Sequence, residues 1–439
     1  MQIWLKNRIQ YPLITLVFFL FVFFSILYNA EDPFFNGVTF SSKKEPLLKS
    51  SHKENLTISG NPPVPLDKSS TCHSTVKYSG RRAKWGSRVL GSGGRRELLE
   101  TCDYTSGKWD FDNISHPLYN ESDCPYMSDQ VACQKYGRSD LDYQYWRWQP
   151  HNCNLKRWNS TELWEKLRGK RLMFVGDSLN RGQWLSMVCL MQSVIPVEKQ
   201  FMTQQAHLTS FRAEEYNASI EFLWAPFLVE SNSDEPMGHR LPEKILRPDS
   251  NLRHSSHWIH ADILVFNSYL WWRKGSVKLL WSTEENGVCE EIDGLRGMEL
   301  AMDAWANWVE SNVDPMKKKV FFVTMSPTHL LKQEWEPGKR GNCYGEKLLI
   351  KNQTRETNVD MPTTLMVEKV LARLSSKVSV LNITRLTAYR KDGHPSIYRK
   401  FYGILSPEEL ANPASYSDCI HWCLPGVSDV WNELLFQFF

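Results

Sequence analysis

Two features are missing from this 439-residue sequence, and each absence excludes a class of protein. None of the ten cysteines forms a C-x2-C pair, the spacing used by zinc ribbons, so no metal site is expected. Basic residues are not in excess: 52 Lys and Arg against 49 Asp and Glu give a formal net charge of +3. A nucleic-acid-binding protein would be much more basic, so no nucleic-acid partner is expected.

Apolar and aromatic side chains, by contrast, are abundant. Hydrophobic residues make up 42% of the chain, enough for a sizeable core in one large domain or two. The chain has 18 Trp, 16 Tyr and 21 Phe. Aromatic faces stack well on sugar rings, although most large aromatics belong to hydrophobic cores. Their number is a first indication of carbohydrate contact.

One uncharged apolar stretch, residues 11–28, just reaches the length of a membrane span. Two basic residues precede it, and positive charge on that side places the N-terminal end in the cytosol. A cleaved signal peptide is the alternative, but no A-x-A-like site follows. We therefore predict a cytosolic tail at residues 1–10, a transmembrane signal anchor at 11–28 and a lumenal body. The short, Phe-rich span suits the thinner membranes of the early secretory pathway.

A lumenal body would allow cysteines to pair and asparagines to be glycosylated. Seven N-x-[ST] sequons are present, at Asn55, Asn113, Asn120, Asn159, Asn217, Asn352 and Asn382. Residues 29–96, rich in Ser, Pro, Gly and Lys, predict a flexible stem, where Cys72 is the candidate for an odd thiol or an intermolecular bridge. Residues 97–165 hold four cysteines and many aromatics. They predict a loop-rich, disulfide-stapled lobe packed on a catalytic domain at 166–439.

Apolar runs and helical patterns alternate after the lobe. Strands are predicted at residues 172–175, 219–224, 261–267, 320–325 and 378–383. Helices are predicted at residues 160–167, 179–195, 298–311 and 363–374. Unbroken apolar strands separated by helices indicate a parallel sheet covered on both faces. Ligands bind at the carboxyl ends of such strands, where Ser178, Asn267 and His329 are expected.

Ser178 is the candidate nucleophile. It follows the strand at 172–175 in the turn Gly176-Asp177-Ser178 and precedes a helix. Free backbone N–H groups and the helix dipole favour negative charge there, so they can hold an oxyanion. Helix capping by the serine is the alternative interpretation.

The matching base is predicted near the C-terminus, in Y-S-D-C-I-H-W-C-L-P-G at 416–426. Asp418 and His421 are three residues apart, so both side chains can point the same way. Asp418 would then hold the imidazole tautomer while the other ring nitrogen faces Ser178. The alternative is that Asp418 caps a short helix and His421 lies on the surface. Two flanking cysteines, which would fix this segment, favour the catalytic interpretation.

The two motifs, G-D-S at 176–178 and D-x-x-H at 418–421, resemble the signatures of the plant trichome birefringence-like family of polysaccharide O-acetyltransferases. The resemblance extends over C-D-Y-T-S-G-K-W at 102–109, W-R-W-Q-P at 146–150 and V-G-D-S-L-N-R-G-Q-W at 175–184. It implies the fold of GDSL/SGNH hydrolases, a three-layer α/β/α sandwich with a parallel sheet. D-I-L-V-F-N-S-Y-L-W-W at 262–272 resembles the xylan-acetylating branch, because other branches more often carry G-H before W-W.

The implied activity is transfer of acetyl groups to O-2 or O-3 of xylosyl residues through an acetyl-serine. No bound cofactor is expected, only an acetyl donor as co-substrate, acetyl-CoA or another carrier. Expected partners are xylan, the Golgi membrane and other wall-polysaccharide biosynthetic proteins. The protein is expected in that membrane as a single-pass type II protein with a lumenal catalytic domain. A polysaccharide acetyl esterase and a non-catalytic wall-polysaccharide-binding protein are the alternatives.

Five further residues are candidates at this site. Asp177 is expected to cap or orient the turn, and Asn267 to donate to the oxyanion or cap its strand. Arg181, Trp271 and Trp272 are candidates for substrate contact, with core packing or a surface salt bridge as the alternative. His329 is expected to be structural.

Disulfide connectivity does not follow from the sequence alone. The hypothesis adopted ties the lobe to itself and to the two motif segments. Its pairs are Cys102–Cys153, Cys124–Cys189, Cys133–Cys419 and Cys289–Cys343.

Overall fold

The structure, a computed structural model, describes residues 75–77, 102–236, 238–239, 241–273, 275–281, 289–350 and 360–439. No helix within these ranges is long and apolar enough to cross a bilayer. The predicted tail, the predicted anchor at 11–28, Cys72 and most of the predicted stem lie outside them.

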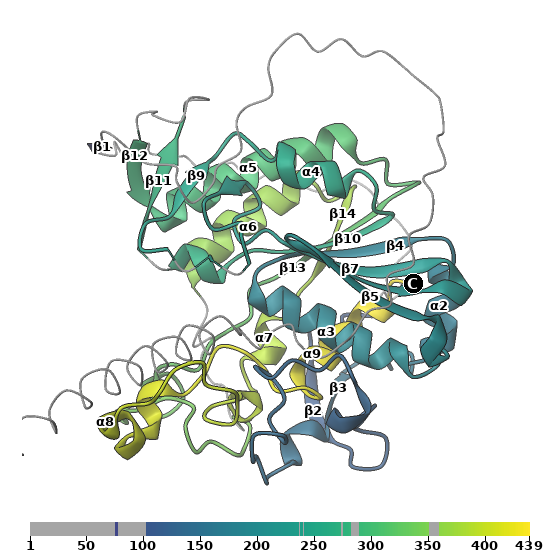
Figure 1. Ribbon diagram of the computed structural model, residues 1–439, viewed down its shortest axis with the longest axis vertical. Coiled ribbons are helices and arrows are strands. Elements are labelled where there is room, and N and C mark those ends of the chain that lie inside the picture. Colours follow the sequence, from purple (N-terminus) through teal and green to yellow (C-terminus); the bar gives the residue numbers. More distant parts are fainter. Residues whose placement is uncertain are drawn as a thin grey trace, which may run out of the picture. The chain divides into compact units, whose positions relative to one another are not determined.

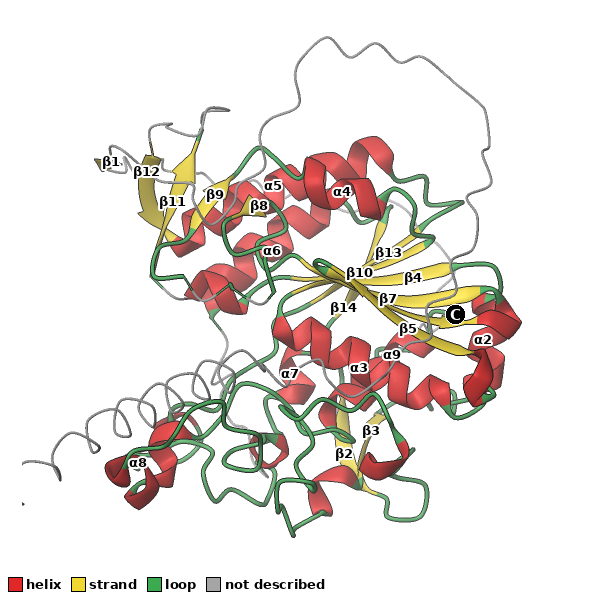
Figure 2. Ribbon diagram, viewed as in Figure 1, coloured by secondary structure: helices red, strands yellow, loops and turns green. Residues whose placement is uncertain are grey.

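A seven-stranded sheet forms the centre of the fold (Figure 2). In spatial order its strands are β14 (Val378–Leu381), β13 (Lys319–Val323), β10 (Ile263–Asn267), β4 (Arg171–Gly176), β7 (Ala218–Trp224), β6 (Leu208–Ala213) and β5 (Gln200–Gln205). The first five are parallel, and all five were expected from their apolar runs. The expectation of a wholly parallel sheet is wrong, because β6 pairs antiparallel with both β5 and β7. Strand β5, Q-F-M-T-Q-Q, is polar and largely exposed, as suits a sheet edge.

Helices cover both faces of this sheet, which makes a three-layer α/β/α arrangement (Figures 1 and 2). On one face lie α2 (Ser160–Leu167), α3 (Ser178–Gln192) and α9 (Val427–Phe436), and on the other α4 (Leu252–Trp258), α5 (Gly294–Asn312) and α6 (Met361–Arg373). Helix α3 is buried almost all round because it packs against β4, β7 and α9. Two short α-helices are α7 (Thr384–Thr387) and α8 (Pro407–Ala411). Short 3-10 helices occur at Glu121–Asp123, Asp142–Gln144, Val197–Lys199, Glu214–Tyr216, Leu270–Arg273, Lys332–Glu334, Lys391–Gly393 and Pro413–Tyr416.

A second sheet, which the apolar pattern did not predict, has the order β1-β12-β11-β9-β8. Its strands are β1 (Thr75–Lys77), β12 (Cys289–Asp293), β11 (Ser276–Leu280), β9 (Ile245–Arg247) and β8 (Glu230–Ser231). Strand β1 falls within residues 29–96, so part of the predicted stem joins a sheet of the body.

The N-terminal lobe has one hairpin-like pair, β2 (Gly107–Phe111) and β3 (Trp146–Pro150), in a segment otherwise made of loops and turns. Hydrogen bonds connect it to the larger part. The Trp109 indole donates to the Leu386 carbonyl at 2.8 Å, and the Tyr119 hydroxyl donates to the Asp429 carboxylate at 3.1 Å. The blue lobe and yellow C-terminal segment lie together on the α3/α9 side of the sheet in Figure 1.

Disulfides reinforce this packing. Cys102–Cys153 and Cys124–Cys189 form as expected. The other two expected pairs are wrong: Cys133 bonds to Cys423 rather than Cys419, and Cys343 bonds to Cys419 rather than Cys289. Cys289 is itself disulfide-bonded. The lobe is thus linked both to helix α3 and to the segment that carries the D-x-x-H motif.

Candidate active site

Ser178 is the first residue of helix α3 and directly follows β4 and the cap residue Asp177. The structure assigns the capping role to Asp177, whose Oδ1 accepts the Leu179 N–H at 2.9 Å. The turn needs glycine at 176, since a Cβ there would lie 2.2 Å from the Asn267 carbonyl oxygen on β10. Ser178 therefore does not cap the helix. Its hydroxyl lies at the carboxyl end of the central strand, β4.

Three side chains form a continuous hydrogen-bonded chain at this position. The Ser178 Oγ lies 2.8 Å from His421 Nε2, across 243 positions of sequence. His421 Nδ1 lies 2.8 Å from Asp418 Oδ2. In the tautomer that satisfies both contacts, Nδ1–H donates to the carboxylate and Nε2 accepts the serine proton. This is the arrangement of a serine nucleophile with its base and an orienting acid.

Asp418 is held ionised in this chain. Its second oxygen accepts the backbone N–H groups of Ile420 and His421 at 3.1 and 3.0 Å, and Arg399 lies 3.7 Å away. Burial opposes ionisation, but the charge and hydrogen bonds of His421, with the Arg399 charge, hold the Asp418 pKa well below its usual range. A fixed negative charge at Nδ1 is the arrangement that stabilises an imidazolium when a histidine takes a serine proton.

Asp177 has the opposite electrostatics although it adjoins the nucleophile. It is fully buried, and burial raises the pKa of its carboxyl to about 6. Backbone N–H groups and the nearby His421 oppose that rise. The carboxyl points into the protein as a cap, which agrees with the supporting role expected from the sequence.

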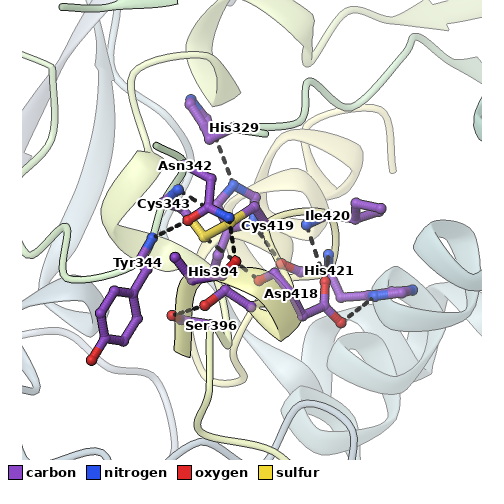
Figure 3. Close-up of a disulfide and its surroundings, with 12 residues drawn as sticks. His329, Asn342, Cys343, Tyr344, His394, Ser396, Asp418, Cys419, Ile420 and His421 are labelled. Atoms are coloured by element: carbon purple, nitrogen blue, oxygen red, sulfur yellow. Dashed lines mark hydrogen bonds and ion pairs between the residues drawn. A yellow bond between two sulfur atoms is a disulfide. The ribbon is translucent and has the colours of Figure 1, made fainter. Parts of the chain in front are cut away.

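The segment carrying Asp418 and His421 is anchored from several sides (Figure 3). Cys419 is bonded to Cys343, and the backbone of Asp418 exchanges two hydrogen bonds of 3.0 Å with Ser396. The buried imidazole of His394 contacts the His421 carbonyl at 2.7 Å and stacks on Trp422. The loop thus has little freedom to carry His421 away from Ser178.

Other residues expected at the site are placed as follows. The Asn267 amide donates to two backbone carbonyls, those of Val323 at 3.0 Å and Thr324 at 3.3 Å, so it ties β10 to the end of β13. Trp271 and Trp272 are 6% and 5% exposed and belong to the hydrophobic core.

Arg181 and His329 were also expected near the nucleophile. Arg181 is half-buried on α3, its backbone N–H bonded to the Asp177 carbonyl and its side chain near enough to Tyr402 to interact electrostatically. His329 is fully buried against His394 and the Ala388 carbonyl, a structural setting.

One residue at the centre was missed by sequence reasoning. The Gln130 amide nitrogen lies 3.2 Å from both ring nitrogens of His421. Gln130 belongs to the N-terminal lobe, 48 residues before Ser178, and no local pattern marks it. Within the described part of the chain, no group of three His, Cys, Asp or Glu residues is arranged to hold a metal ion.

Comparison with known proteins agrees with this geometry. Residues 155–438 match the model of the GDSL/SGNH-like acyl-esterase family found in Pmr5 and Cas1p, and residues 100–154 match the PMR5 N-terminal domain. Over its whole length the chain is 58% identical to trichome birefringence-like protein 35 of Arabidopsis thaliana, covering 99% of that protein. It is 46% identical to xylan O-acetyltransferase 14 of Oryza sativa subsp. japonica, over 76% of each chain.

Proposed function

The chain belongs to the PC-Esterase family of GDSL/SGNH-like acyl-esterases, and from that membership we propose that it is a xylan O-acetyltransferase acting through an acetyl-serine. The observation that carries the chemistry is the hydrogen-bonded chain from Ser178 through His421 to Asp418. The choice of xylan is supported by relatives from rice that are named xylan O-acetyltransferases.

The reaction is proposed as a double displacement. His421 takes the Ser178 proton while Oγ bonds to the acetyl carbon, and the imidazolium returns that proton to the departing carrier. A xylosyl O-2 or O-3 hydroxyl then attacks the acetyl-serine, giving its proton to His421. As the ester bond to Ser178 breaks, the imidazolium protonates Oγ and the enzyme is restored. One imidazole serves both halves because it is neutral before each attack.

Transfer and hydrolysis share these residues and differ only in whether a sugar or water attacks the acetyl-serine. One experiment with a variant and the wild-type enzyme tests the role of Ser178 and distinguishes transfer from hydrolysis. Ser178→Ala, incubated with an acetyl donor and xylo-oligosaccharide, is expected to lose acetylation and to carry no acetylated residue at 178 by mass spectrometry. Ser193→Ala, at the exposed end of α3, is the matched control and should behave as wild type.

Two outcomes would contradict the proposal. Undiminished acetylation by Ser178→Ala would exclude the serine as acetyl carrier. Release of acetate without sugar acetylation by the wild-type enzyme would establish the esterase instead. Mapping the products by NMR would also assign O-2 or O-3.

The proposal further places the catalytic domain in the Golgi lumen, behind an anchor at residues 11–28. Four disulfides among the described residues support an oxidising compartment. The five described sequon asparagines are exposed, as glycosylation requires: Asn113, Asn120, Asn159, Asn217 and Asn382. Protease treatment of intact Golgi vesicles should spare the domain, and digestion without detergent would refute this placement.

A further inference from the structure

Gln130 is brought to the catalytic histidine by the N-terminal lobe. Its loop is fixed on either side by Cys124–Cys189, which reaches helix α3, and by Cys133–Cys423, which reaches the segment of His421. The residue is half-buried, and Val131, its neighbour, accepts the Leu424 N–H through its carbonyl. The loop that carries the side chain to His421 is therefore held by three connections that do not involve the Gln130 amide.

Among the residues that the structure describes, the Gln130 amide nitrogen contacts the His421 ring alone. Its nitrogen is equally close, 3.2 Å, to both ring nitrogens of His421, so it lies over the ring rather than in line with either lone pair. His421 Nδ1 carries the proton given to Asp418, and the Nε2 lone pair accepts from Ser178. Neither nitrogen can then accept from Gln130. An amide donor held against the catalytic imidazole, whose Nε2 contacts Ser178, is prepared for a negative charge that forms later.

Other obvious amide donors are committed elsewhere. The Asn267 amide is bonded to the Val323 and Thr324 carbonyls. The Leu179 N–H, in the first turn of α3, is bonded to the Asp177 carboxylate. The one side chain that the sequence suggested as an oxyanion donor is thus committed to the end of β13, and one backbone donor of the first turn of α3 is committed to the helix cap.

We propose that Gln130 supplies the side-chain donor of the oxyanion hole, so that the N-terminal lobe completes the catalytic site. This inference rests on the proposed acyl transfer at Ser178. When Oγ bonds to the acetyl carbon, the carbonyl oxygen becomes an oxyanion and accepts the Gln130 N–H. The oxyanion returns to a carbonyl when the carrier leaves. The same bond forms again when the sugar hydroxyl attacks, so Gln130 acts in both halves of the reaction.

The test separates donation from packing. Gln130→Met keeps the length of the side chain but has no N–H group, and Gln130→Ala removes both. Loss of one such donor lowers kcat about 10²- to 10³-fold in a serine hydrolase. Both variants are therefore expected to have a kcat about 100-fold lower in two assays. One assay measures acetylation of the enzyme by 4-nitrophenyl acetate, and the other measures acetyl transfer to xylo-oligosaccharide. KM and the pH profile should be little changed, because His421 and Asp418 keep their contact.

Gln134→Ala is the matched control, since Gln134 lies on the same loop and its backbone N–H bonds to Glu121. Activity of Gln130→Met within threefold of wild type would overturn the inference, as would a shifted pH profile, which would indicate that Gln130 only positions His421. Ser178→Ala, assayed alongside, distinguishes failure of the proposed acyl transfer from failure of the proposed role of Gln130. If Ser178→Ala is inactive while Gln130→Met is active, acyl transfer at Ser178 is supported and the role of Gln130 is refuted.

Discussion

At the scale of single residues, three buried carboxyl groups differ in pKa because their surroundings differ. Asp418 is surrounded by a histidine, backbone N–H groups and an arginine, and its pKa is held low. Asp177 and Asp429 are fully buried, and burial raises their pKa values to about 6 and about 7. Of the three, Asp418 is the one bonded to the His421 ring, which separates the proposed catalytic carboxylate from the two that cap helices.

Asp429 lends itself to a pH-dependence prediction. It accepts hydrogen bonds from the Ser186 and Tyr119 hydroxyls at 2.6 and 3.1 Å and from the Gly426 N–H at 2.6 Å. Its raised pKa favours the protonated folded state. The contribution of Asp429 to the free energy of unfolding is fully present below the pKa of the unfolded chain, about 3.9. It is lost as the pH rises through the pKa of the folded protein, about 7.

The free energy of unfolding should therefore contain a loss on the order of 4 kcal/mol between pH 4 and pH 8 that Asp429→Asn does not show. Urea unfolding of both proteins across this range measures it. Parallel pH curves for the two proteins would contradict the assignment.

At the scale of elements, the β4–α3 turn depends on how closely β10 approaches β4. Residues Gly176 and Asn267 are paired across the two strands, and this contact leaves no space for a side chain at 176. The approach also brings Asn267 to the edge of the site, where its amide donates to the Val323 carbonyl on β13. The turn geometry is thus a consequence of sheet packing as much as of local sequence.

Two glycine substitutions give opposite expected effects. Gly176→Ala would press its Cβ against the Asn267 carbonyl and should destabilise the protein by about 1–3 kcal/mol or more. Gly182→Ala, one turn into α3, has open space around it and should stabilise by about 0.5–1 kcal/mol through helix propensity. Chemical denaturation measures both, and a Gly176→Ala protein as stable as wild type would show that the strands can separate.

At the scale of the whole molecule, the proposed catalytic side chains come from opposite ends of the family domain, and disulfides link the lobe to both ends. Cys124–Cys189 joins the lobe to the helix of Ser178, and Cys133–Cys423 joins it to the segment of His421. Cys343–Cys419 anchors the same segment from a third part of the chain.

Removing Cys343–Cys419 should therefore affect activity directly. The double variant Cys343→Ser/Cys419→Ser is expected to lower kcat about tenfold while the central domain remains folded, because Cys419 lies between Asp418 and His421. A loss of this size corresponds to about 1.4 kcal/mol of transition-state stabilisation. Cys102→Ser/Cys153→Ser, which removes a bond within the lobe, is the matched control. Equal loss of kcat in both variants would mean that disulfides act only on general stability.

The sequence by itself determined the five parallel strands, the helices α2, α3, α5 and α6, and the placement of Ser178 after a strand. These follow from local apolar periodicity and from motifs of neighbouring residues. The polar hairpin β5–β6 was not predicted because its alternation of apolar and polar residues is weak. The second sheet was not predicted because its strands are short. Cys419 and Cys423 are four residues apart on one loop, so only the path of that loop decides which bonds to Cys133 and which to Cys343. The contacts of Ser178 with His421 and of Gln130 with the imidazole were likewise decided by the tertiary structure, since packing of distant segments is not encoded in any one stretch of chain.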